Sequence, residues 1–96
     1  MITSDHITEM KQRLKIYHQF EDDHIENLLE QSYEDLNKRC GGFEMDDSIT
    51  GRELVYERTR YAYNDSLEFF YDNFLGHITS FSLNNTLNGD DVDGNL

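Results

Sequence analysis

The chain has 96 residues, 36% of them hydrophobic, and a formal net charge of −12. This length fits one domain with one small core, and eight Lys and Arg residues are too few for the clustered cations that a nucleic-acid-binding surface requires. The single Cys40, the lack of an apolar run of about 20 residues and the lack of a leader-like start favour a soluble protein of a reducing, cytoplasmic compartment, with no membrane partner.

The spacing of apolar residues predicts an all-α chain, because they recur at steps of three and four and no proline interrupts them. The first helix is expected to begin near Ser4, a good N-cap residue. Its buried side is expected to comprise Ile7, Met10, Leu14 and Tyr17. It is short, so it can cover only part of a longer neighbour.

The second helix is expected to begin at Asp22 or Asp23, where Asp23 and Glu26 can form a capping box, and to end at Gly41. One narrow stripe of this helix is expected to face the core: Ile25, Leu28, Leu29, Ser32, Leu36 and Cys40. The acidic residues lie mostly off this stripe, which predicts a solvated acidic face.

A long third helix is expected to begin at Thr50, which can form a T-x-x-E capping box with Glu53, and to run to Gly76 or Phe81. Three apolar residues at and before its start are expected to pack beneath the helices: Phe43, Met45 and Ile49. If the helix is continuous, a bulky apolar strip runs along it: Tyr56, Arg60, Tyr63, Leu67, Phe70, Phe74, Ile78 and Phe81. A strip of mostly small residues lies beside it: Val55, Thr59, Ala62, Ser66, Phe69 and Asn73.

Two interpretations of these strips stay open. In the first, the other two helices each cover one strip and complete a small three-helix bundle. In the second, part of the bulky strip stays exposed and mediates self-association, because exposed apolar patches of this size mark interfaces. The residues predicted for a subunit interface are Tyr56, Arg58, Arg60, Tyr63, Phe70 and Phe74. The two arginines either find carboxylates of the second helix, in the same or a neighbouring subunit, among Glu26, Glu30, Glu34 and Asp35, or extend their guanidinium groups into solvent.

Near the C-terminus the sequence becomes polar and loses its helical period. Residues 1–82 are therefore expected to form the helical domain, and residues 83–96 a flexible acidic tail. Leu83, Leu87, Val92 and Leu96 are spaced along this tail, as suits a segment that becomes ordered on a partner. Its GDDVDG sequence lacks the ligand spacing of a calcium-binding loop.

No pattern predicts catalysis, a metal or a cofactor. The histidines do not pair at metal-ligand spacing, and Cys40 has no activating neighbour and lies on an apolar stripe. The chain is therefore not expected to be an enzyme.

Three stretches resemble the small head-tail connector proteins of tailed bacteriophages, also called adaptor or head-completion proteins. They are ITSDHITEMKQRLKI, EDDHIENLLEQSYEDLNKRCG and ERTRYAYNDSLEFFYDNFLGHITSFSL, similar to the family's short first helix, acidic second helix, and long third helix with tail. The resemblance covers residues 2–88, and the third stretch is the most specific.

The resemblance implies a virion protein at the head-tail interface, found in the host cytoplasm during assembly. Its subunits would form a ring, usually twelve-fold, beneath the portal protein, extend the DNA channel without binding DNA specifically, and dock a stopper or tail-completion protein. The tail of such proteins grips the portal, which here implies portal-binding residues Phe81, Leu83 and Leu87. The acidic end GDDVDGNL departs from the family's pattern.

Two other functions stay open. The net charge suits a small acidic regulator or DNA mimic that binds a basic partner. A helical dimer of the antitoxin type would need a recognition helix rich in basic and amide residues, and none is evident.

Overall fold

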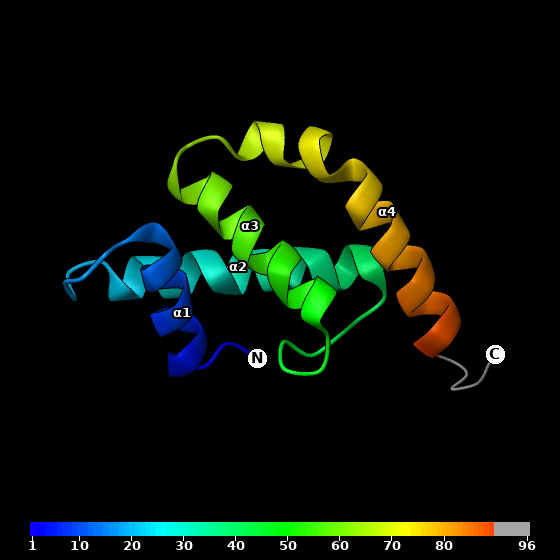
Figure 1. Cartoon of the computed structure of the whole chain (residues 1–96), viewed down its shortest axis with the longest axis horizontal. Coiled ribbons are helices and arrows are strands. Elements are labelled where there is room, and N and C mark those ends of the chain that lie inside the picture. Colours follow the sequence, from blue (N-terminus) through cyan, green and yellow to red (C-terminus); the bar gives the residue numbers. More distant parts are fainter. Residues whose placement is uncertain (90–96) are drawn as a thin grey trace.

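A computed structural model describes residues 1–89, and all of their regular elements are helical (Figure 1). The elements are α1 (Ser4–Leu14), α2 (Asp22–Cys40), α3 (Ile49–Tyr63), the 3-10 helix η1 (Leu67–Phe69) and α4 (Phe70–Gly89). The all-α prediction is confirmed for this part of the chain. The predicted arrangement of three helices with a long third one is wrong, because the chain turns between α3 and α4.

Helix α1 begins one residue earlier than a Ser4 cap predicts. Thr3 is the N-cap, and its hydroxyl accepts from the backbone N–H of His6 while its own N–H donates to Nδ1 of His6. The helix ends at Leu14, and the next residue, Lys15, adopts a left-handed conformation with φ 60°. Tyr17 therefore lies beyond the helix and is 84% exposed, so its predicted place on the buried side is wrong.

Helix α2 lies at the centre of the fold and contacts α1, α3 and α4. The predicted stripe is buried at Ile25, Leu29, Ser32, Leu36 and Cys40, and Leu28 is half-buried. The predicted capping box at the start of α2 is absent, since its N-cap residue makes no side-chain hydrogen bond to the helix. The helix ends where predicted, at a glycine with φ 88°.

The start of α3 differs from the prediction by two residues. Ser48, not Thr50, caps the helix, and its Oγ accepts from the N–H of Gly51 at 3.0 Å. Gly51 leaves room for the ring of Phe43, because a Cβ at this position would come within 2.6 Å of two ring carbons. Ile49 is 71% exposed, so its predicted burial in the loop cluster is wrong.

The turn between α3 and α4 overturns the prediction of one long helix. Asp65 adopts a left-handed conformation with φ 58°, which asparagine and aspartate tolerate better than most residues. The N–H of Ser66 donates to the carbonyl of Tyr61 at 2.8 Å, and Nδ2 of Asn64 donates to the carbonyl of Arg60 at 2.9 Å. These bonds satisfy carbonyls at the C-terminal end of α3, so the chain can reverse here.

Helix α4 continues past the predicted domain boundary at residues 82 and 83. Nδ2 of Asn85 donates to the carbonyls of Cys40 and Gly42 at 2.7 and 2.8 Å, and Oγ of Ser82 donates to the carbonyl of Arg39. A helix packed against the end of α2 thus replaces the first part of the predicted flexible tail. Val92, Leu96 and the acidic end lie outside the described residues.

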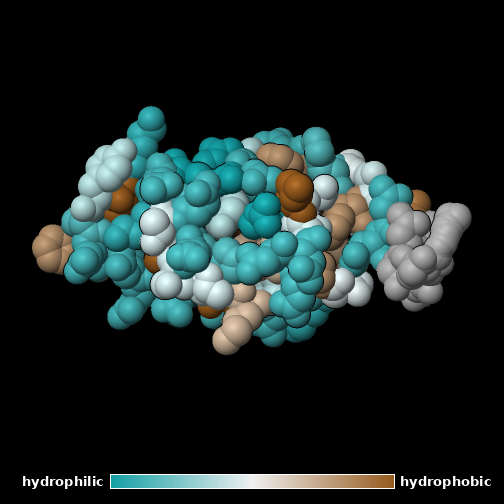
Figure 2. All heavy atoms as spheres, turned by 60° about the horizontal axis from the view of Figure 1, so that its bottom comes forward, coloured by the Kyte–Doolittle hydropathy of each residue, from teal (hydrophilic) through white to brown (hydrophobic). Residues whose placement is uncertain are grey.

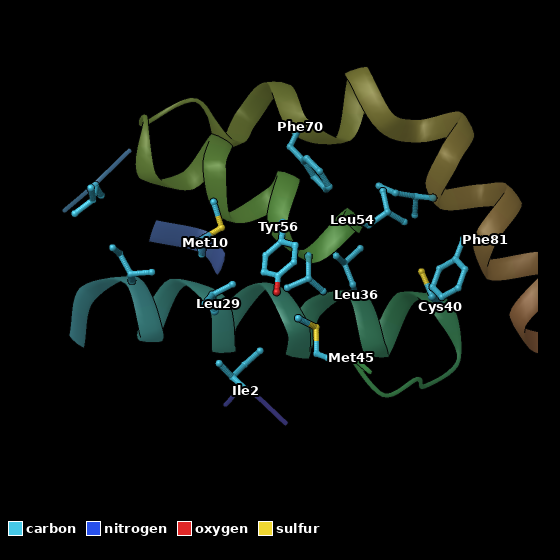
Figure 3. Packing of buried hydrophobic residues seen from close by; sticks show 14 residues of the cluster. Ile2, Met10, Leu29, Leu36, Cys40, Met45, Leu54, Tyr56, Phe70 and Phe81 are labelled. Atoms are coloured by element: carbon cyan, nitrogen blue, oxygen red, sulfur yellow. The ribbon is translucent and has the colours of Figure 1, made fainter. Parts of the chain in front are cut away.

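The core lies between α2 and the surrounding helices (Figure 3). Tyr56 points from α3 toward α2, and Phe70 points inward from the start of α4 (Figure 3). Near the end of α2, three aromatic rings meet edge to face, with centroids 5.5 Å apart from Tyr33 to Phe43 and 5.3 Å from Phe43 to Phe81. This contact attaches the second half of α4 to the rest of the domain.

Candidate functional site

The fold divides the predicted interface residues between the core and the surface. Tyr56 and Phe70 are 2% and 0% exposed and are packed inside their own chain, so in this conformation they are not available to a neighbour. Tyr63 and Phe74 are half-buried. The hydroxyl of Tyr63 lies 3.0 Å from both carboxylate oxygens of Glu21, and the ring of Phe74 stacks on Phe70 with centroids 5.1 Å apart.

The two arginines of the predicted interface have partners in their own chain. Arg58 donates from Nε to the hydroxyl of Tyr71 at 2.8 Å, and its Nε lies 3.4 Å from Oδ2 of Asp35. Arg60 pairs instead with Glu57 of its own helix, at 2.6 Å. The side chain of Arg58 is only 12% exposed and that of Arg60 is 44% exposed, so Arg60 alone has room to contact another molecule.

Asp35 is the centre of a polar cluster between α2, α3 and α4. Its Oδ2 accepts from the hydroxyl of Tyr71 at 2.6 Å and from Nε of Arg39 at 2.9 Å. Burial by itself raises the pKa of Asp35, but the hydrogen bonds from Tyr71 and Arg39 outweigh this effect and hold the pKa below its ordinary value. The cluster binds α4 to α2, and we interpret it as structural.

A second polar cluster lines a hollow of about 360 Å³ between α1, the α2–α3 loop and α3. Nδ1 of His6 accepts from the N–H of Thr3, so Nε2 carries the proton of the neutral ring and donates to Asp46 at 2.9 Å. Arg13 donates to both carboxylate oxygens of Glu53, at 3.0 and 2.8 Å. The lining residues include no serine or cysteine, so the His-Asp pair has no nucleophile to activate there.

The largest exposed apolar side chains near α1 are those of Tyr17 and Phe20, in the loop between α1 and α2. They are 84% and 93% exposed, and we call this pair the aromatic tip. The loop lies at one end of the molecule's long axis (Figure 1). The ring of His18 lies against Phe20, with centroids 5.1 Å apart.

An apolar groove of about 230 Å³ lies between the start of α3 and the first half of α4. We call it the apolar groove, and it is lined by Ile49, Thr50, Glu53, Leu54, Glu57, Phe74 and His77. It is on a different part of the molecule from the aromatic tip. Hydrophilic side chains predominate on the face in Figure 2, and hydrophobic atoms there form only small, separate groups.

The portal-binding residues implied by the resemblance have different environments. Phe81 is 9% exposed and packs on Phe43, so it belongs to the core. Leu83 is 59% exposed on α4, and Leu75, about two turns before it, is 62% exposed. Leu87 lies within α4, and its side chain is outside the described part of the structure.

The described residues provide no metal site, since no three or more of their His, Cys, Asp and Glu side chains are grouped to hold an ion. None of the helices in residues 1–89 is both long and apolar enough to span a membrane. No family model, no curated protein and no solved structure matches the chain.

Sequence reasoning missed the aromatic tip and the exposure of Ile49. Phe20 lies in the polar linker HQFEDD, outside every apolar stripe, and this position indicated that its side chain is exposed. Ile49 is the first residue of α3, directly after the cap Ser48, and is 71% exposed.

Proposed function

We propose that this chain is a structural subunit that assembles with copies of itself, and that it serves as a head-tail connector of a tailed bacteriophage. Its ring would sit beneath the portal, extend the DNA channel and dock a stopper or tail-completion protein. The observation that carries the proposal is apolar surface left uncovered on a strongly charged domain. Tyr17, Phe20 and Ile49 are each more than 70% exposed, although the chain carries a net charge of −12.

The charge distribution along α4 also supports a binding role. Residues 70–89 contain one formally charged residue, Asp72, whereas charged residues make up 29% of the whole chain. Helix surfaces that face only water usually carry many charges, and the centres of interfaces are depleted of them. The exposed side of α4, with Leu75 and Leu83, is therefore the surface that we assign to the portal.

The net charge suits a channel through which DNA passes without being bound. A wall of like charge releases no counterions when DNA passes, so DNA gains no affinity for it. Many cations of the chain are already paired with its own carboxylates, as in the contacts of Lys11 with Asp22 and of Arg13 with Glu53. The alternative of an acidic regulator or DNA mimic has only the net charge in its favour.

The proposal is tested with the purified full chain and the portal ring of the same phage. Light scattering and negative-stain images are expected to show added mass and an added collar on the portal, with the chain alone as the reference. Leu83→Asp is expected to keep its helical circular dichroism and to bind portal at least about 30-fold more weakly, the loss typical of an interface hot spot. A wild-type chain that stays monomeric and never joins the portal would refute the proposal.

A further inference from the structure

A further groove lies between the C-terminal end of α2 and the exposed side of α4. Its volume is about 380 Å³, and we call it the α4 groove. The residues that line it are Arg39, Leu75, Ile78, Thr79, Ser82 and Leu83. Oγ of Ser82 donates to the carbonyl of Arg39 at 3.0 Å, which holds the end of α2 beside this part of α4. The groove thus combines apolar side chains of α4 with one guanidinium group of α2.

The α4 part of the groove is apolar surface that its own chain leaves uncovered. Leu75 and Leu83 are 62% and 59% exposed, and they lie about 12 Å apart along the helix. Ile78, which lines the groove between them, is 7% exposed and belongs to the core. Asp72, the one charged residue of α4, is not among the lining residues. Exposed apolar surface with few charges is typical of the centre of an interface.

Arg39 has hydrogen-bond donors that its own chain does not use. Its Nε donates to Oδ2 of Asp35 at 2.9 Å, and its guanidinium lies over the ring of Tyr71, 4.4 Å from the centroid. These two contacts orient the guanidinium, whereas Nη1 and Nη2 donate to no described residue. The side chain is 51% exposed. Two donors in one plane, beside apolar surface, match the two oxygens of a carboxylate.

The positive charge of Arg39 is not fully compensated within the described residues. Asp35 also lies 3.4 Å from Nε of Arg58, so two guanidinium groups share one carboxylate. No other carboxylate of residues 1–89 forms an ion pair with either arginine. Charges more than about 8 Å away are largely screened at physiological ionic strength, so this local surplus, and not the net charge of −12, acts on a segment bound in the groove.

We propose that the α4 groove binds a segment of the portal protein in which an apolar side chain lies beside a carboxylate. The carboxylate accepts from Nη1 and Nη2 of Arg39, and the apolar side chain covers Leu75 and Leu83. The inference rests on the proposed function, which assigns this side of α4 to the portal, and it adds the chemistry of the segment that the portal presents. Arginine is one of the side chains that contribute most to interface affinity.

Two short peptides test the chemistry of the groove on the full-length chain. Acetyl-Leu-Glu-Leu-amide offers a carboxylate between two apolar side chains, and acetyl-Leu-Gln-Leu-amide is its neutral match. In NMR titrations of the labelled chain, both are expected to shift amides of residues 38–40 and 75–83, and the glutamate peptide is expected to bind at least about 5-fold more tightly. Added salt reduces this preference, because it screens the ion pair. Equal binding of the two peptides, or no shift at residues 75–83, overturns the inference.

Two variants of neighbouring cations locate the carboxylate. Arg39→Gln removes the guanidinium from the groove, and Lys38→Gln is the matched control, because Lys38 does not line the groove. The two side chains are 51% and 77% exposed, so both variants are expected to fold. Arg39→Gln is expected to bind the two peptides equally, whereas Lys38→Gln keeps the preference for the glutamate peptide. A preference that survives in Arg39→Gln overturns the inference.

A third variant tests whether the chain's own acidic end competes for the groove. Residues 90–96, DDVDGNL, also combine carboxylates with apolar residues. Full-length Val92→Ser is expected to bind the glutamate peptide as wild type does. If this variant binds it at least about 5-fold more tightly, the chain's own residues occupy the groove and the inference is overturned.

The portal experiment separates this inference from the proposed function. Arg39→Gln is expected to bind the portal at least about 5-fold more weakly than wild type, and Lys38→Gln as wild type does. If Arg39→Gln binds the portal as wild type does, the groove contact is refuted and the connector function stands. If the peptides bind as expected but wild type never joins a portal, the carboxylate-binding groove stands and the connector function is refuted.

Discussion

Replacing Tyr71 by phenylalanine tests how α4 is held to α2. The change removes one hydroxyl, which donates to Oδ2 of Asp35 at 2.6 Å and accepts from Nε of Arg58 at 2.8 Å. The ring can keep its place, including its edge-to-face contact with Phe70 at 5.1 Å. The variant therefore isolates two hydrogen bonds to charged groups from the packing of the aromatic ring.

Hydrogen bonds to charged groups contribute about 1.5–3 kcal/mol each. The side chain of Asp35 is 26% exposed, so water can replace part of the loss, and we expect the free energy of unfolding at pH 7 to fall by about 2 kcal/mol. Urea unfolding followed by circular dichroism measures this change. Tyr61→Phe is the control, because its hydroxyl accepts from Nδ2 of Asn73 at 3.0 Å, beside the guanidinium of Arg60, and bonds to no carboxylate of the described residues; its loss is expected to cost about 0.5 kcal/mol.

The effect of Tyr71→Phe should depend on pH. The pKa of Asp35 is depressed in the folded chain, so Asp35 contributes stability above its ordinary value of 3.8, and this contribution is lost as the pH falls through the lower folded value. The variant lacks one cause of that depression. The difference between variant and wild type should thus be full at pH 7 and shrink below pH 3.8. A loss no larger than that of Tyr61→Phe, or one that stays constant at acid pH, would refute this account of the cluster.

Three further changes test the turn, the end of α4 and the core. Asp65→Gly should raise the free energy of unfolding by about 0.5–1 kcal/mol, because residue 65 has φ 58°; a continuous helix would instead be destabilised by glycine, and urea unfolding distinguishes the two signs. Asn85→Ala should increase hydrogen exchange at residues 82–89 and cost about 1–2 kcal/mol, because it removes the donor to the carbonyls of Cys40 and Gly42; unchanged exchange would contradict this role. The thiol of Cys40 is 0% exposed, and burial raises its pKa, so a thiol reagent at pH 8 should label the native chain at least about 100-fold more slowly than the urea-unfolded chain; equal rates would place it at the surface.

Local patterns predicted α1, α2 and most of the core correctly. The stripe of α2 could be identified because its residues recur at helical spacing and two glycines follow it. The turn after α3 was missed although Asn64, Asp65 and Ser66 favour helix ends and turns, because the aromatic pattern continues across them without a change of period.

Local patterns were also insufficient to predict the candidate site. Whether an aromatic side chain is buried depends on which helix lies opposite it, and a wheel drawn for one continuous helix only assigns Phe70 and Phe74 to the same bulky strip as Tyr56 and Tyr63. Long-range pairs such as Tyr71 with Asp35, 36 positions apart in the sequence, leave no local signal. The exposure of Phe20 was easier to predict, because this aromatic residue lies in a polar linker and belongs to no apolar stripe of a helix.

The turn at residues 64–66 changes which apolar surface the chain leaves uncovered. With one long helix, the uncovered apolar surface would be a single strip, and two copies could pair through the same surface. The reversal instead packs Phe70 and Phe74 against Tyr61, with ring centroids 5.8 Å from each. The apolar surface that remains includes two unlike parts, a projecting tip at Phe20 and a groove beside Ile49. The surface left for a partner therefore depends on which aromatic side chains the turn buries, and not on their spacing along the sequence.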